Sequence, residues 1–190
     1  PGKPSIITTT SLTNDATPTI EGIAEAGSTV ELFNGSDSLG TATADGTTGI
    51  FSITPSSELS EGLNSLTVTA TDAINNVSAA SSALSITVDT TAPTQPAITT
   101  TTTLTSDATP TIEGTAEAGS TVTLFVDGVT TGITTTADEN GNFVITSSKL
   151  SDSQYSLTVA ATDAVGNTSL SSGAISLTIA SVLASSDDEE

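Results

Sequence analysis

Asp15-Ala-Thr-Pro-Thr-Ile-Glu-Gly22 is repeated as Asp107-Ala-Thr-Pro-Thr-Ile-Glu-Gly114 later in the same chain of 190 residues. A second matching pair follows at the same spacing, Ala24-Glu-Ala-Gly-Ser-Thr-Val30 and Ala116-Glu-Ala-Gly-Ser-Thr-Val122. The copies lie 92 residues apart, which is too long for a solenoid repeat and suits one small domain. The chain is therefore predicted to hold two tandem domains of one kind.

Each copy contains short stretches rich in Thr, Val and Ile that alternate between apolar and polar residues, separated by Gly, Asn, Asp and Pro. This pattern predicts β-strands with one buried face. Strands are expected in the first copy at Ser5–Thr10, Thr19–Ala24, Thr29–Phe33, Leu39–Ala44, Ile50–Thr54, Ser65–Thr71 and Ala83–Val88. The predicted fold class is all-β, with two tandem Ig-like antiparallel β-sandwich domains of about seven strands each.

A short joint with two prolines separates the copies, Asp89-Thr-Thr-Ala-Pro-Thr-Gln-Pro96. Each proline fixes φ and removes a backbone donor, which stiffens the joint. We expect one Ig-like domain over residues 1–89, a linker over 90–96 and a second Ig-like domain over 97–183. Residues 184–190 are rich in acid and are expected to form a disordered tail.

The charge balance restricts the partners of the chain. Two basic residues, Lys3 and Lys149, face 22 acidic ones, for a formal net charge of -20. Nucleic acid binding is not expected, because it depends on Lys and Arg meeting phosphate. No apolar run is long enough to span a bilayer, so membrane insertion is not expected either. Water and hard cations suit such a surface.

Catalytic side chains are scarce. The chain has no His and no Cys, and it lacks a Gly-rich phosphate loop. Glu21 and Glu25 have no neighbour in sequence that would tune an acid or a base. We therefore do not expect an enzyme. Aromatic residues are 3% of the chain, which weakens the case for a carbohydrate-binding face.

Acidic side chains are predicted to converge where the two domains meet. In an Ig-like path, three loops of the second copy lie at the pole where the chain enters; two carry Glu117 and Asp163, and Asn167, Asp138 or Asn140 would lie within reach. Asp89 ends the last strand of the first copy and arrives at the same pole. Calcium takes six to eight oxygen ligands, whereas zinc favours His and Cys. These residues therefore predict a Ca²⁺ site.

The first copy carries a partial version of this arrangement. Glu25, Asp72 and Asn76 occupy the corresponding pole and would be completed by a preceding domain of a longer protein. Asp15 would support Asp89 from the other side of the joint. Each acid alone is also explained as a turn residue whose carboxylate accepts backbone hydrogen bonds, so this alternative stays open.

One difference between the copies bears on stability. Tyr155 precedes the sixth strand of the second copy, where sandwich domains often carry a tyrosine corner, and Asn64 takes its place in the first. The first domain is therefore expected to be the less stable, by about 1 kcal/mol.

Three further stretches, taken with the repeat quoted first, carry a family resemblance: Val88-Asp-Thr-Thr-Ala-Pro93, Glu139-Asn-Gly-Asn-Phe143 and Ala161-Thr-Asp-Ala-Val-Gly-Asn167. They resemble the bacterial Ig-like repeats of giant surface adhesins and biofilm-associated proteins. The resemblance implies sandwich modules in long rods, Ca²⁺ at the joints, secretion to the bacterial cell surface, and neighbouring Ig-like domains of a longer chain as partners. The second copy departs at its end, where Ile179-Ala-Ser-Val replaces Val88-Asp-Thr-Thr.

The leading hypothesis is a structural extender segment of a bacterial cell-surface adhesin, stiffened by Ca²⁺ at the interdomain joint. One alternative is a self-assembling subunit of an extracellular filament or surface layer, in which exposed strand edges pair between copies. A second alternative is a carbohydrate- or ligand-binding module.

Overall fold

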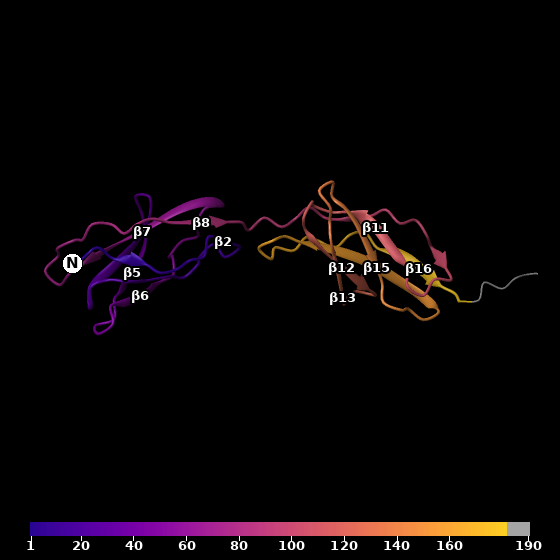
Figure 1. Ribbon diagram of the computed structural model, residues 1–190, viewed down its shortest axis with the longest axis horizontal. Helices are drawn as coiled ribbons and strands as arrows, with labels where there is room; N and C mark the ends of the chain where they lie inside the picture. Colours follow the sequence, from indigo (N-terminus) through magenta and orange to yellow (C-terminus); the bar gives the residue numbers. More distant parts are fainter. Residues whose placement is uncertain (182–190) are drawn as a thin grey trace, which may run out of the picture. The chain divides into compact units, whose positions relative to one another are not determined.

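The computed structural model describes residues 1–181, which divide into two compact units, Pro1–Thr90 and a second that begins at Thr91 (Figure 1). Both units are built of strands, and residues 1–181 contain no helix long and apolar enough to cross a membrane. The predicted acidic tail, residues 184–190, lies outside the described residues, as does the end of the domain expected to reach residue 183.

The first unit is a sandwich of two sheets. A three-stranded sheet has the order β1-β3-β6, and a five-stranded sheet has the order β2-β8-β7-β4-β5. The strands are β1 (Ser5–Ile6), β2 (Leu12–Thr13), β3 (Ile20–Ile23), β4 (Thr29–Asn34), β5 (Asp37–Thr43), β6 (Ile50–Ile53), β7 (Gly62–Thr71) and β8 (Leu84–Val88).

The second unit repeats this arrangement, with sheets in the orders β14-β11-β9 and β10-β16-β15-β12-β13. Its strands are β9 (Ala97–Ile98), β10 (Leu104–Thr105), β11 (Thr111–Thr115), β12 (Thr121–Val126), β13 (Val129–Thr136), β14 (Asn142–Thr146), β15 (Ser153–Thr162) and β16 (Ile175–Ile179). The predicted fold class, two tandem antiparallel sandwiches, is confirmed.

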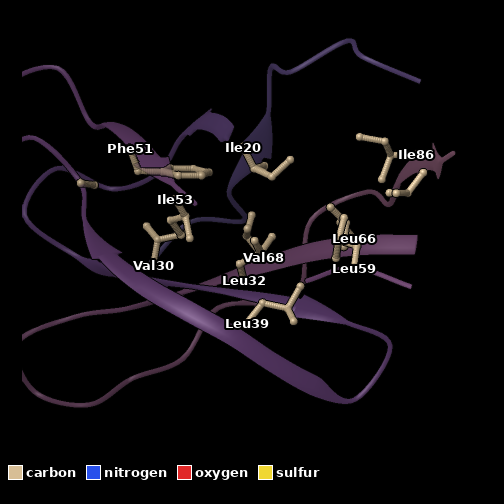
Figure 2. Close-up of a cluster of buried hydrophobic side chains, with 12 residues drawn as sticks. Ile20, Val30, Leu32, Leu39, Phe51, Ile53, Leu59, Leu66, Val68 and Ile86 are labelled. Atoms are coloured by element: carbon tan, nitrogen blue, oxygen red, sulfur yellow. The ribbon is translucent and has the colours of Figure 1, made fainter. Parts of the chain in front are cut away.

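Alternating apolar residues of both sheets fill the space between them, as the sequence pattern predicts (Figure 2). In the first unit, Ile20 and Phe51 come from the three-stranded sheet, and Leu32 and Val68 come from the five-stranded one; all are buried. In the second unit, the buried residues include Ile112, Val122, Leu124, Phe143, Ile145, Leu157, Val159, Leu177 and Ile179. Each such side chain contributes about 1.5–3 kcal/mol by leaving water, which holds the sandwich without a disulfide.

The first strand differs from its predicted form. Ser5–Thr10 does not run as one strand, because the chain leaves the first sheet after β1 and joins the other sheet as β2. There, β2 pairs with β8 in parallel, and Leu12 and Thr13 lie opposite Thr87 and Val88. Residues 8–10 are all Thr, so they supply no apolar alternation that would hold a continuous strand on one sheet. In the second unit, β10 and β16 make the same parallel pair.

The tyrosine corner forms in the second unit, where the hydroxyl of Tyr155 donates to the carbonyl of Ser151 at 3.2 Å. In the first unit, Asn64 is buried and has a network of its own. Its Nδ2 donates to the carbonyls of Ser60 and Gly62, and its Oδ1 accepts from Asn34 at 2.8 Å. A lower stability of the first domain therefore no longer follows from the missing tyrosine.

Gly22 lies beneath the core phenylalanine of the first unit. A Cβ atom at Gly22 would meet Phe51 Cζ at 2.2 Å and the carbonyl oxygen of Ser5 at 2.3 Å. Gly114 stands in the same relation to Phe143 and to Ala97 in the second unit. The close packing of β1 or β9 on its neighbour therefore requires glycine at this point.

We expect Gly22→Ala to lower the free energy of unfolding of the first unit by about 1–3 kcal/mol, because overpacking displaces the ring or the edge strand. Urea unfolding of the purified chain measures this loss. Gly46→Ala is the control, since no heavy atom lies within 4 Å of a Cβ built there. Equal midpoints for the two variants would contradict this account of the core.

Candidate metal centre

The entry pole of the second unit brings together the loops that the sequence analysis singled out. Thr121 pairs with both Thr136 and Thr162, so the loops next to these residues lie at one end of the sandwich. Ala97 pairs with Thr115, which brings the incoming segment to the same end. Glu117 and Asp163 therefore lie on loops of one pole, as predicted for this unit.

Asp163 organises the loop that follows β15. Its Oδ1 accepts hydrogen bonds from the backbone N–H groups of Val165, Gly166 and Asn167 at 2.8–2.9 Å. Its Oδ2 accepts a bond of 2.8 Å from Nδ2 of Asn167. The same Nδ2 also donates to the carbonyl of Thr91 at 3.4 Å. Asn167 thus links the Asp163 carboxylate to the segment that enters the unit.

These contacts favour the ionised form of Asp163. Desolvation raises the pKa of the carboxyl, but the hydrogen bonds from the side chain and backbone of Asn167, and those from Val165 and Gly166, outweigh it. The pKa therefore lies below the ordinary value of 3.8. Asp163 remains an anion at neutral pH.

Glu117 lies at an exposed position in the loop between β11 and β12. Its backbone carbonyl accepts hydrogen bonds from the N–H of Ser120 at 3.1 Å and from the hydroxyl of Ser120 at 2.7 Å. Gly119 has a φ of 80°, a left-handed conformation that side chains disfavour, so this loop is sharply turned. The backbone fixes the position of Glu117 at the pole.

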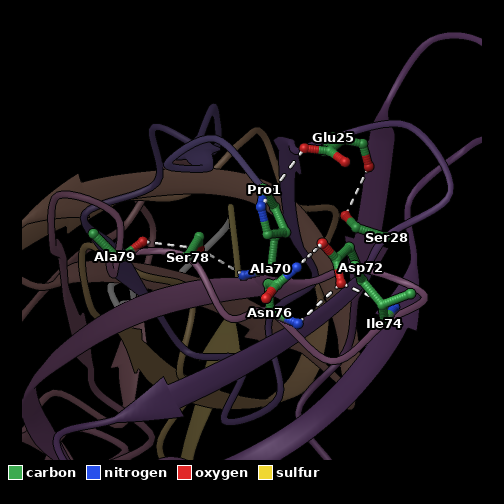
Figure 3. A network of polar contacts seen from close by, with 9 residues as sticks. All are labelled: Pro1, Glu25, Ser28, Ala70, Asp72, Ile74, Asn76, Ser78 and Ala79. Carbon is green, nitrogen blue, oxygen red and sulfur yellow. Dashed lines mark hydrogen bonds and ion pairs between the residues drawn. The ribbon is translucent and has the colours of Figure 1, made fainter.

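The first unit has the same arrangement at its own entry pole (Figure 3). Asp72 Oδ1 accepts the N–H groups of Ile74 and Asn76, and its Oδ2 accepts Nδ2 of Asn76 at 2.8 Å. The side chain of Asn76 is the largest cause that lowers the pKa of Asp72 below 3.8. Glu25 and Asp72 line one groove of about 260 Å³, and Oε2 of Glu25 lies 3.8 Å from the amino group of Pro1.

The exit end of the first unit carries two of the predicted acids. The backbone N–H of Asp89 donates to the carbonyl of Thr13 at 2.9 Å, immediately after β8. Asp15 follows β2 in a turn, where its N–H donates to Oγ1 of Thr13 and its Oδ1 accepts the N–H of Thr17 at 2.8 Å. Asp15 therefore lies beside the end of β8 as expected, and its carboxylate is used to hold a turn.

Sequence reasoning missed a third carboxylate at this exit end. Oε2 of Glu61 accepts hydrogen bonds from the N–H and the hydroxyl of Thr90, at 3.0 and 2.8 Å. Asp152 receives the corresponding bonds from Ser181 in the second unit. The signal in the sequence is the spacing, because Glu61 and Asp152 lie 91 residues apart, and so do Thr90 and Ser181.

The second unit has no acid at the position that Asp89 takes after the last strand of the first unit. The N–H of Ala180 donates to the carbonyl of Thr105, as the N–H of Asp89 does to Thr13. Ala180 is therefore the counterpart of Asp89, and the predicted departure at Ile179-Ala-Ser-Val occurs at this position.

The available donors suit a hard cation. Within either unit, over residues 1–181, no cluster of three or more Asp, Glu, His or Cys side chains could hold a metal ion by itself. Asp89 belongs to the first unit and Glu117 and Asp163 to the second, so a site that combines them stays a prediction. All of these candidates offer oxygen, the ligand atom of Ca²⁺.

A profile of the bacterial Ig-like domain matches the chain twice, over residues 5–90 and 94–180. The chain therefore belongs to the bacterial Ig-like domain family, with two copies of the domain in tandem. This is a structural, non-enzymatic kind of fold. No curated protein sequence matches the chain significantly.

Two of the similar solved structures share the fold with TM-scores of 0.50 or more. Fibronectin(III)-like modules of CbhA from Clostridium thermocellum are 15% identical over 97% of this chain and 98% of theirs, with a TM-score of 0.58. A Ca²⁺-stabilised adhesin that helps an Antarctic bacterium reach out and bind ice is 26% identical over 94% of this chain, with a TM-score of 0.50. This chain spans about half of that adhesin structure, 48%. A 1.5-MDa bacterial ice-binding adhesin is 24% identical over 93% of this chain and 64% of its own, with a TM-score of 0.46.

The lowered pKa values of Asp72 and Asp163 predict how stability depends on pH. Their stabilising effect is complete above the unfolded-state pKa, near 3.8, and is lost as the pH falls through the lower folded-state value. The urea concentration at the unfolding midpoint should therefore decrease as the pH is lowered below about 4. The double variant Asp72→Asn, Asp163→Asn should have a lower urea midpoint at pH 7. Its midpoint should also decrease less than that of the wild type when the pH is lowered.

Urea unfolding between pH 7 and pH 2 measures this dependence, with Glu58→Gln, an exposed carboxylate elsewhere in the first unit, as the control. An acid-induced fall of the same size in the double variant and in the wild type would show that the two aspartates are not responsible.

Proposed function

We propose that this chain is an extender segment of a bacterial cell-surface adhesin, in which Ca²⁺ at the joint between the two Ig-like units stiffens the chain. The observation that carries the proposal is the bond from Asn167 to the carbonyl of Thr91. It ties the incoming segment to the Asp163 carboxylate at the pole that also carries Glu117.

Chain connectivity supports a contribution from Asp89. Two residues span at most about 7 Å, so Asp89 cannot lie far from Thr91. Asp163 is ionised and its Oδ1 accepts three backbone N–H groups, which fixes the direction of the carboxylate. A carboxylate has about four acceptor sites in all, and Oδ2 accepts one hydrogen bond, from Asn167. Oδ2 of Asp163 therefore retains the capacity to coordinate a cation.

Charge explains why a divalent ion would stiffen the joint. The chain has a formal net charge of -20, and carboxylates drawn together in one place repel one another. Asp89, Glu117 and Asp163 would tolerate that proximity once a Ca²⁺ ion neutralises part of their charge. With Ca²⁺ bound, Asp89 is held to the second unit. Without it, repulsion favours separation and the joint bends more freely.

The comparisons support the location and the role. The family is bacterial, and one similar structure belongs to an adhesin described as Ca²⁺-stabilised that helps its bacterium reach out and bind ice. These findings support an extracellular position at the bacterial surface, with neighbouring Ig-like domains of a longer chain as the partners. Glu25, Asp72 and Asn76 would complete a second site of the same kind with a preceding domain. The ice binding of that adhesin is not transferred to this chain.

Calcium titration by calorimetry tests the proposal. We expect a dissociation constant of about 10⁻⁴–10⁻³ M for the wild type, in the range of extracellular modules. Asp89→Ala and Asp163→Ala should each abolish the heat of binding. Asp37→Ala, which removes an exposed carboxylate at the β4–β5 turn, should leave it unchanged.

A second readout is the shape of the chain in solution. Small-angle scattering should show a more extended and less variable chain with Ca²⁺ than with chelator, and the melting temperature should rise with Ca²⁺ by mass action. The proposal fails if chelator leaves both the scattering curve and the melting temperature unchanged.

A further inference from the structure

The second strand of each unit, which follows the entry strand, is bonded directly to the last strand, by which the chain leaves. In the first unit, β2 runs parallel to β8, and the N–H groups of Thr87 and Asp89 donate to the carbonyls of Ser11 and Thr13 at 2.8 and 2.9 Å. In the second unit, the N–H groups of Thr178 and Ala180 donate in the same way to Thr103 and Thr105. Each unit is therefore closed by a short parallel pair.

The parallel pair lies on the path of a force applied along the chain. Tension pulls β2 toward its N-terminal end and β8 toward its C-terminal end. Because the two strands are parallel, they must slide past each other in opposite directions. Their hydrogen bonds are then loaded together in shear and cannot open one after another. In the first unit, the pair has only two residues on the β2 side, so any added bond matters.

Glu61 adds such a bond just beyond the pair. It precedes Gly62, the first residue of β7, which lies opposite Val88. Its Oε2 accepts both the N–H and the hydroxyl of Thr90, the second residue after β8. The hydrogen bonds are charge-assisted, which makes them stronger than bonds between neutral groups. The exit segment is thus attached to β7 as well as to β2.

The second unit builds the same attachment from different residues. Oδ1 of Asp152 accepts the N–H of Ser181 at 3.1 Å, and Oδ2 accepts its hydroxyl at 2.6 Å. Glu with Thr in one copy and Asp with Ser in the other preserve an acid that binds both the amide and the hydroxyl of one exit residue. The arrangement, rather than the residue type, is repeated.

We propose that Glu61 and Asp152 are mechanical latches, whose hydrogen bonds hold the exit strand of each unit against tension along the chain. The inference extends the proposed extender function, since an extender is pulled through its ends. It does not depend on Ca²⁺, because each latch lies within one unit. The latch acts together with the parallel pair, so its loss leaves the exit strand held by the short pair and by the ladder to its antiparallel neighbour.

Single-molecule force spectroscopy of the whole chain, pulled through its ends in buffer with chelator, tests the latches. The wild type should give two unfolding events, one for each unit. Glu61→Ala should lower the unfolding force of one event and raise its rate at fixed force about three- to tenfold, as expected for the loss of hydrogen bonds to a charged group. Glu61→Ala with Asp152→Ala should lower both. Glu58→Ala lies in the same segment between β6 and β7 and is the matched control. It should change the unfolding force of neither event.

A second pulling geometry distinguishes resistance to force along the exit strand from a general effect of Glu61 on stability. The chain has no cysteine, so Ser36→Cys and Gly46→Cys provide attachment points on exposed turns that leave the exit strand unloaded. When the double-cysteine chain is pulled through these two points, the unfolding force should be the same with and without Glu61→Ala. Unchanged forces through the ends, or equal losses in both geometries, would overturn the proposal. Because chelator is present, the failure of the calcium site would not affect this result.

Discussion

A carboxylate that accepts backbone N–H groups is the interaction on which both ends of each sandwich depend. Asp72 and Asp163 hold the loops of the entry poles, while Glu61 and Asp152 hold the exit segments. A chain with two basic residues and 22 acidic ones has few cations with which to fasten its loops by ion pairs. It uses its own amides and hydroxyls as the partners of its acids.

The hydrophobic core gives the two units the same loop positions at their ends. Alternating apolar residues from two sheets fix the register of every strand, so equivalent loops of the two units take equivalent positions. The glycine beneath each core phenylalanine lets an edge strand approach closely. The first strand then crosses to the other sheet and pairs with the last. The path that buries the core therefore also pairs the second strand of each unit with its last.

The repeat and the alternation were enough to predict the fold class and the strands around Leu32, Val68 and their counterparts, because burial imposes a period of two. The split of the first strand was not predictable in this way, since a Thr-rich stretch has no apolar pattern to reveal a change of sheet. The poles of Glu25, Glu117 and their neighbours followed from topology. Glu61 was missed because its partner, Thr90, is 29 residues away and neither residue forms a recognisable motif.

The central claim is that oxygens of two successive units share one Ca²⁺ ion. Anomalous scattering from crystals of the chain grown in calcium measures this most directly. The account predicts an anomalous peak about 2.3–2.6 Å from carboxylate oxygens of Asp89, Glu117 and Asp163. Crystals that show no peak at the joint, with Asp89 and Asp163 directed apart into solvent, would contradict it.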